Sequence, residues 1–288
     1  MHGAPPLTQT FTEVTTGLGF GKPLAAPWQP LAACPLLIMV GVTGVGKSTT
    51  LGALAATALD FSLLPDRREL TDRLIITYLQ QQDGDPIQPV SDRKVRFAYT
   101  RRYREQFGGG MSHALEQLQV DRSIWPGWLI FDGLRGAEEV THAYQSLPHA
   151  RFVVLDAPDL VRVQRLLGRN DAFDRITATT TTAATTATAS LAALGLAEGD
   201  ALFSPAEVQQ LLHLATPPVG SGSIAPADLR AKLAIVIEER RNYDPQAAIA
   251  ILQRNAAART LHIDTTQVAA VDAAQQIAEW ITCQPAQQ

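Results

Sequence analysis

The chain has 288 residues, of which 46% are hydrophobic, and a formal net charge of −4 at pH 7. This size and apolar content suit one large α/β domain or a domain with a substantial insertion, and the acidic balance argues against a general nucleic-acid binder. No run approaches the ~20 apolar residues of a membrane span, the N-terminus lacks the pattern of a secretory signal, and two cysteines, Cys34 and Cys283, make no disulfide framework, so we expect a reduced, cytoplasmic protein.

Residues 1–34 are rich in Pro, Gly and Thr, which predicts a loosely ordered N-terminal extension. The rest of the chain, 35–282, is interpreted as one domain that begins with an apolar strand over 35–40. That strand leads into a complete G-x-x-x-x-G-K-[ST] loop, and a helix is expected from Thr49 to Ala56. Strand, loop and helix in this order are the context in which the pattern binds phosphate.

The residues of this loop are suited to bind a polyphosphate together with Mg²⁺. Glycines let successive backbone N–H groups point inward, and these groups and the helix dipole hold the phosphates. Lys47 would neutralise the β- and γ-phosphates, and the Ser48 hydroxyl would ligate Mg²⁺. The expected nucleotide contacts are therefore Gly41, Thr43, Gly44, Val45, Gly46, Lys47, Ser48 and Thr49.

The segment after the loop is polar and rich in arginine. A short second strand is expected near 61–64, and apolar residues at helical spacing predict helices from Arg67 onward, over 92–106, and from the Gly108-Gly109-Gly110 turn to Leu118. Aromatic residues interleave with the arginines, which could suit base stacking. For Tyr99 and Tyr103, however, a spacing of four favours a helix core stripe.

The remaining strands alternate with helices. Strands are predicted over 128–131, 151–156 and 260–264, and helices over 138–144, 158–167, 228–241, 245–255 and 268–281. A capping box at Ser204 starts a further helix, whereas 177–190 is a low-complexity Thr/Ala tract and 217–223 a linker. Five apolar strands in this alternation imply a parallel sheet covered on both faces, with ligands at the carboxyl ends of the strands.

Asp132 ends the predicted third strand and is the second candidate site residue. A carboxylate in that position commonly holds a nucleotide-bound Mg²⁺, and the alternative is a turn or helix-capping aspartate, since Gly133 follows. The glutamate that hydrolytic motor and helicase ATPases place after this aspartate is missing. No Asn-Lys-x-Asp guanine-reading element occurs, so ATP is the expected nucleotide.

Three segments resemble those of P-loop kinases, and one of them is 261–266 with its amphipathic tail helix, which resembles their C-terminal strand and helix. The run from Phe131 to Val140 is similar to the Asp-Gly-x-x-Arg segment of adenylate kinases and of dephospho-coenzyme-A-kinase-like proteins, and 151–158 with the following arginines resembles their next strand and lid helix. The resemblance covers about 35–175 and 240–282. It implies a three-layer P-loop NTPase fold with strand order 2-3-1-4-5, an acceptor-binding segment at 65–120, and a lid at 170–240 enlarged by a helical insertion.

The resemblance also assigns roles to arginines. Arg165 and Arg169, on one helix face with Arg162, would approach the transferred phosphoryl group or the adenine side, with a solvated basic face as the alternative. Arg135 would contact an acceptor phosphate, unless it pairs with Glu138 or Glu139 on the next helix. Further candidate arginines are Arg175, Arg240 and Arg241.

The leading hypothesis is an ATP-dependent phosphotransferase of the nucleoside-monophosphate-kinase-like superfamily. Lys47, Asp132, Arg135, Arg165 and Arg169 would be catalytic, Ser48 and Asp132 would hold Mg²⁺, and the acceptor would be a small phosphorylated or nucleotide-like molecule. The alternative is a nucleotide-dependent switch or scaffold ATPase that binds a protein partner through 177–240. A nucleic-acid-directed ATPase is less favoured because of the acidic balance, and the six histidines show no zinc-site spacing.

Overall fold

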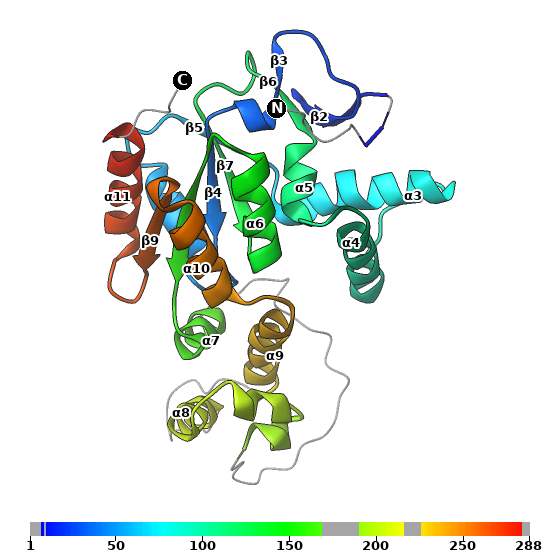
Figure 1. Ribbon diagram of the computed structural model, residues 1–288. Helices are drawn as coiled ribbons and strands as arrows, with labels where there is room; N and C mark the ends of the chain where they lie inside the picture. The colour runs from blue at the N-terminus through cyan, green and yellow to red at the C-terminus, as the bar shows by residue number, and fades with distance from the viewer. Residues whose placement is uncertain (1–6, 9, 169–189, 216–225, 284–288) are drawn as a thin grey trace.

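The computed structural model describes residues 7–8, 10–168, 190–215 and 226–283 of the chain (Figure 1). Within these ranges, no helix combines the length and the apolarity that a bilayer span requires. Of the low-complexity tract predicted at 177–190, all but the last residue lies outside the described residues, as do the linker predicted at 217–223 and the candidate arginines Arg169 and Arg175.

A five-stranded parallel sheet forms the centre of the fold. Its strands are β4 (Leu36–Val40), β5 (Phe61–Leu63), β7 (Trp128–Leu134), β8 (Ala150–Asp156) and β9 (Thr260–Asp264). They lie in the order β5-β7-β4-β8-β9, with every neighbouring pair parallel. Numbered along the chain, that order is 2-3-1-4-5, which confirms the predicted α/β P-loop NTPase fold.

Helices cover both faces of this sheet and make the three layers. On one face, α1 (Lys47–Leu54) packs with α11 (Ala270–Cys283); on the other lie α5 (Met111–Glu116), α6 (Ala137–Ser146) and α10 (Pro245–Asn255). Strand β4 is buried along its whole length and alternates between the two cores. Its continuous apolar sequence follows from that double burial.

A helical arm follows β5. It consists of α2 (Arg67–Leu70), a π-helical segment η2 (Thr71–Ile76), α3 (Thr77–Asp83) and α4 (Arg93–Phe107). Asp92 caps α4 by accepting a hydrogen bond from the N–H of Val95. Tyr103 is fully buried against Tyr78 and Phe107, and Tyr99 is partly buried against the same core. The core interpretation of these aromatic residues therefore agrees with their packing.

The N-terminal residues form part of a second sheet rather than a loosely ordered extension. Strands β1 (Thr12–Thr15), β2 (Leu18–Phe20) and β3 (Trp28–Pro30) join β6 (Leu118–Asp121) in an antiparallel sheet, and the short helix η1 (Leu31–Ala33) leads into β4. The helix predicted to reach Leu118 ends at Glu116, because β6 pairs with strands almost a hundred residues earlier in the chain. Local periodicity carries no signal of such pairing.

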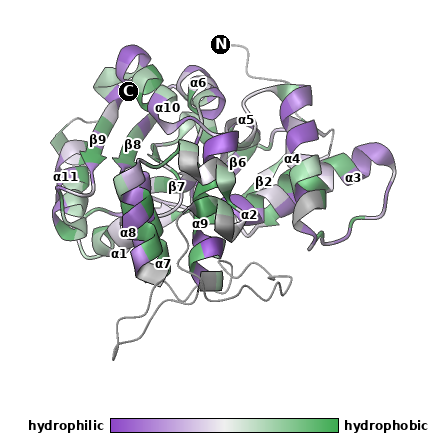
Figure 2. Ribbon diagram, turned by 90° about the horizontal axis from the view of Figure 1, so that it is seen from below, coloured by the Kyte–Doolittle hydropathy of each residue, from purple (hydrophilic) through white to green (hydrophobic). Residues whose placement is uncertain are grey.

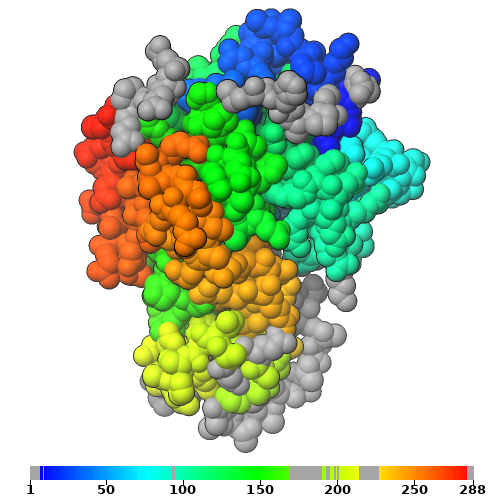
Figure 3. Space-filling model, viewed as in Figure 1, coloured from blue at the N-terminus to red at the C-terminus, as the bar shows by residue number. Residues whose placement is uncertain are grey.

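A third apolar cluster lies beyond the carboxyl ends of the central strands. It joins α7 (Asp159–Leu167), η4 (Leu191–Leu194), α8 (Pro205–Ala215) and α9 (Pro226–Asn242). The short helix η5 (Ala197–Ala201) contacts η4 and α9, while η6 (Ala257–Arg259) precedes β9. We call α7, η4, η5, α8 and α9 the helical cluster. Figure 3 shows α8 and α9 in yellow and gold below the central domain. The predicted capping box is present, since Ser204 and Glu207 exchange hydrogen bonds.

A buried histidine, His113, lies in α5, which packs against α6. The ring of His113 stacks on Phe107 with ring centroids 4.7 Å apart, and its Nδ1 lies 2.9 Å from the Tyr103 hydroxyl. Burial, with a smaller contribution from His142, lowers the pKa of His113 from 6.5 to about 4, although Glu116 acts in the opposite direction. His113 is therefore neutral in the folded chain at pH 7.

The pKa of His113 predicts a loss of stability in acid. Because the folded-state pKa lies below the unfolded one, the stabilisation is present above pH 6.5 and is lost as pH falls toward 4. Between pH 7.5 and 4.5, the wild type should lose up to about 2.5 kcal/mol more unfolding free energy than His113→Gln. Urea unfolding at both pH values measures this difference. The exposed His149→Gln variant should keep the wild-type pH dependence, and equal losses in all three proteins would contradict the assignment.

Candidate functional site

The phosphate-binding loop lies where β4 ends, at the carboxyl edge of the sheet. Figure 1 shows the arrowheads of the central strands directed toward α7 and α9, and Figure 2 shows the same two helices across this edge from below. Gly44 has φ of 88°, and a Cβ atom there would lie 3.0 Å from the carbonyl oxygen of Arg162. Gly46, with φ of 99°, caps α1. Glycine is therefore required both for the loop conformation and for the close approach of α7.

Lys47 is the first residue of α1 and points back across the loop. Its Nζ donates to the carbonyl oxygens of Gly41 at 2.9 Å and Val42 at 3.2 Å, and lies 3.7 Å from Oδ1 of Asp132. Burial lowers the pKa of Lys47, while Asp132 raises it in part. The predicted lysine and aspartate are thus brought together by β4 and β7, which are neighbours in the sheet.

Asp132 fits the proposed metal-linked role. Its Oδ1 is buried and has no hydrogen-bond partner among the described residues, although it lies near Lys47. Ser48 lines the same cavity. The described ranges contain no group of three His, Cys, Asp or Glu side chains able to form a complete metal cage. The pair of Ser48 and Asp132 on one cavity wall suits Mg²⁺, which usually binds one or two protein ligands together with phosphate oxygens and water.

A carboxylate from α9 reaches the phosphate-binding loop. Glu239 accepts hydrogen bonds from the N–H of Thr43, at 3.0 Å to Oε2, and from its hydroxyl, at 2.5 Å to Oε1. Arg135 Nη1 lies 2.6 Å from Oε1, and Arg162 Nη2 lies 2.5 Å from Oε2. Burial alone would raise the pKa of Glu239, but Arg135, Arg162, Thr43 and Lys47 together lower it, so the carboxylate is ionised.

The predicted arginines take different positions. Arg135 lines the cavity, and its guanidinium pairs with Glu239 rather than with Glu138 or Glu139, the partners predicted as the alternative. The carboxylate of Glu139 pairs with Arg67 and accepts a hydrogen bond from the backbone N–H of Arg135. The Nε of Arg135 is buried and has no hydrogen-bond partner in the described part of the chain. Arg135 therefore keeps a donor that no described residue uses.

Arg162 and Arg165 both belong to helix α7, but their side chains lie in different environments. Arg165 lines the cavity and donates to Thr265 Oγ1 and to its carbonyl oxygen, each at 2.8 Å. It also donates to the carbonyl oxygen of Gly44 at 3.4 Å, so it links the phosphate-binding loop to the segment after β9. Arg162 is fully buried and bonds Asp159, Glu239 and the carbonyl oxygen of Thr43. At these two positions, α7 therefore does not form the solvated basic face that was the alternative prediction. Arg240 and Arg241 pair with Asp159 and Glu238.

One cavity of about 570 Å³ joins these groups. The predicted residues on its wall are Thr43, Gly44, Gly46, Lys47, Ser48, Thr49, Asp132, Arg135 and Arg165. Gly41 and Val45 lie in the same loop but are not on the wall. Thr265 and residues 268–270, where the chain enters α11, also line the cavity. The cavity thus combines the loop and its charged neighbours with small and apolar residues.

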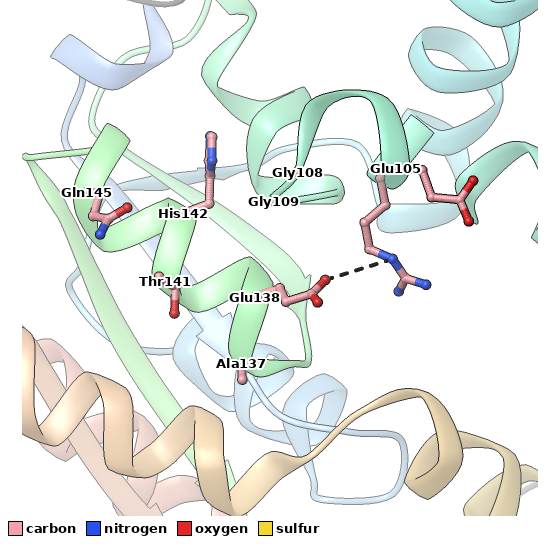
Figure 4. Close-up of a pocket in the computed structure, with 9 residues that line it drawn as sticks. Glu105, Gly108, Gly109, Ala137, Glu138, Thr141, His142 and Gln145 are labelled. Atoms are coloured by element: carbon pink, nitrogen blue, oxygen red, sulfur yellow. Dashed lines mark ion pairs between the residues drawn. The ribbon is translucent and has the colours of Figure 1, made fainter. Parts of the chain in front are cut away.

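A second cavity, of about 550 Å³, lies between the end of α4 and α6. Figure 4 shows Gly108 and Gly109 above α6, from which Glu138, Thr141 and His142 project. Arg104 lies 3.9 Å from Glu138 across the opening. This cavity is lined by the end of the arginine-rich segment and by α6, and it shares no lining residue with the cavity around Lys47.

Sequence reasoning missed Glu239 and Thr265. Glu239 lies 196 residues after Thr43, in a helix whose sequence Glu-Glu-Arg-Arg is typical of a solvated helix face. Thr265 directly follows the last strand, and this position at a strand's carboxyl end was the one feature of the sequence that could have indicated a place in the cavity. The burial of Arg162 was also missed, because three arginines on one helix face look alike in the sequence.

No protein-family model matches the chain, and neither does any curated protein. Among solved structures, the chain is similar to a gluconokinase from Sinorhizobium meliloti 1021, with 15% sequence identity and a TM-score of 0.23. The match covers 74% of this chain and 97% of the gluconokinase chain. At this TM-score the two chains superpose poorly, so the roles of the residues rest on the site itself.

Proposed function

We propose that the chain transfers the γ-phosphoryl group of Mg-ATP to a small acceptor, which is phosphorylated or nucleotide-like. The observation that carries this proposal is the joint presence of Lys47, Asp132, Arg135 and Arg165 with the phosphate-binding loop in one cavity. Phosphoryl transfer requires little covalent chemistry from a protein, because positioning and neutralisation of charge supply most of the catalysis. The groups in this cavity can supply both.

Each of these groups would act on a particular part of the reaction. The loop N–H groups and Lys47 would hold the β- and γ-phosphates, while an acceptor oxygen bonds to the γ-phosphorus and the bond to the departing ADP breaks. Ser48 and Asp132 would hold Mg²⁺, which would neutralise charge on the phosphates. By the resemblance to P-loop kinases, Arg165 and Arg169 would stabilise charge on the transferred group.

The acceptor would bind on the side of Arg135 and the helical arm. Arg135 and Arg67 both lie about 6 Å from the Tyr243 ring, with Arg67 hydrogen-bonded to Glu139 and to the carbonyl oxygen of Gly133. Such guanidinium groups suit a phosphorylated acceptor. We accordingly assign 65–120 to acceptor binding and 170–240 to a lid within the domain 35–282, while 1–34 adds the strands of the small sheet.

A nucleotide-dependent switch is the second candidate function, and the contact between Glu239 and the loop favours it. Through α9, that contact joins the loop to the helical cluster, so a bound nucleotide could change the position of the cluster. A protein partner would then bind through 177–240. In this alternative, ATP binds tightly but no acceptor increases its turnover.

An acceptor screen separates the two functions. The protein is incubated with Mg-ATP and a panel of nucleotides and phosphorylated metabolites, and ADP is measured. We expect ADP to accumulate with one acceptor class and only slowly without it, since Gly133 stands where hydrolytic ATPases carry glutamate. The product should carry the ³²P label of γ-labelled ATP. Tight ATP binding without acceptor-dependent ADP would support the switch instead.

A further inference from the structure

The carboxylate of Glu239 makes contacts that an anionic ligand of the loop would make. Its two oxygens accept from the backbone N–H of Thr43 at 3.0 and 3.2 Å, and Thr43 is the third residue of the loop. Backbone N–H groups of such loops bind phosphate oxygens. A carboxylate oxygen and a phosphate oxygen therefore require the same donor.

Two arginines strengthen this contact. Arg135 and Arg162 each bond one oxygen of Glu239, at 2.6 and 2.5 Å, and the carboxylate is almost fully buried between them. Lys47 is close enough to add to the positive charge that lowers the pKa of Glu239. A phosphoryl group entering this position would meet the fixed negative charge of Glu239. Both anions cannot use the Thr43 N–H and the two arginines together.

Glu239 is attached to a part of the fold that is separate from the central sheet. Helix α9 packs on α7 and α8 in the helical cluster, through apolar residues that include Leu233 and Val236. Figure 1 shows α9 beside α7, below the carboxyl ends of the strands. Arg240, the next residue, is 2.7 Å from Asp159 of α7. The carboxylate therefore reaches the loop from an element that contributes no strand to the sheet.

We propose that Glu239 is a built-in competitor of the nucleotide: its carboxylate occupies the Thr43, Arg135 and Arg162 donors and has to leave them when the terminal phosphates of ATP bind. The inference rests on the proposed function only in that the loop binds ATP. It adds a regulatory contact, because any ligand or partner that moves α9 would change the affinity for ATP. If the state with Glu239 on these donors is favoured about 10- to 100-fold, the apparent affinity for ATP falls by the same factor.

Nucleotide affinity tests this proposal without requiring turnover. Titration calorimetry at fixed Mg²⁺ concentration measures the Kd of ATP and of AMP for the wild type, for Glu239→Gln and for Glu238→Gln. Glu238 is the matched control, because it lies next to Glu239 on α9 but its carboxylate bonds Arg241 and Asn242 of the same helix instead of the loop. We expect Glu239→Gln to bind ATP about 10- to 100-fold more tightly and AMP unchanged, and Glu238→Gln to resemble the wild type.

Three results would overturn the competitor role. They are an unchanged or weaker affinity of Glu239→Gln for ATP, equal tightening for ATP and AMP, and the same gain in Glu238→Gln. Thermal melting checks that each variant folds. If Glu239→Gln does not fold, Glu239→Asp keeps the charge opposite Arg162 but shortens the reach, and must bind ATP more tightly than the wild type. A wild type that binds no ATP would refute the proposed function itself, whereas ATP binding without any acceptor would leave this test valid.

Discussion

Lys47→Ala should lose phosphoryl transfer by about 10²- to 10³-fold while the protein remains folded. In the proposed function the lysine is the cation on the β- and γ-phosphates, so its removal would leave the developing charge without that stabilisation. ATP affinity should fall about 10- to 100-fold as well, as expected for losing a charge-assisted hydrogen bond. ADP formation with the acceptor found in the screen, together with calorimetric titration of ATP, measures the two effects.

A second lysine provides the control for this prediction. Lys22 is exposed and lies outside the cavity, so Lys22→Ala removes the same charge without changing the loop. Both variants should give the wild-type far-ultraviolet circular dichroism spectrum. Unchanged turnover and unchanged ATP affinity in Lys47→Ala would contradict the proposed site.

Arg162→Ala should lower the free energy of unfolding by about 3–5 kcal/mol. The side chain is fully buried, and its guanidinium pairs with Asp159 and with Glu239, each at 2.5 Å. Without Arg162, the mostly buried carboxylates lose a cationic partner, which costs more than the ion pair itself contributes. Urea denaturation followed by circular dichroism measures the change.

An exposed ion pair gives the matched comparison. Arg101 lies 3.7 Å from Glu105 on the surface of α4, and its side chain is 71% exposed. Arg101→Ala should therefore change stability by about 0–1 kcal/mol, because water and salt screen such pairs. If the two variants lose the same stability, Arg162 does not hold the loop, α7 and α9 together as the distances indicate.

The central fold could be predicted from the sequence because its signals are local. The strand before the loop, the glycine pattern from Gly41 to Gly46, and the apolar runs that end in Asp132 and Asp156 each occupy a short stretch of chain. Their alternation with helices predicts a parallel sheet, and the resemblance to P-loop kinases supplied the strand order. The position of Lys47 beside Asp132 followed, because the carboxyl ends of β4 and β7 meet at one edge.

The small sheet could not be predicted in the same way. Strand β6 pairs with β2 and β3, which lie almost a hundred residues earlier, and its four residues follow directly on a helix. Short strands of this kind have no periodicity of their own. Their conformation is decided by the partners that tertiary structure places beside them.

By itself, the sequence determined the phosphate-binding loop, the lysine and aspartate that accompany it, and the order of helices and strands around them. Only the tertiary structure decided which side chains meet. Glu239 accepts a hydrogen bond from Thr43 and pairs with Arg135 and Arg162, and Arg165 donates a hydrogen bond to Thr265. The physical reason is that an ion pair depends on distance in space, and side chains of the same type along one helix differ only in what packs against them. The contact between α9 and the loop therefore became visible only after the helical cluster had been placed at the carboxyl edge of the sheet.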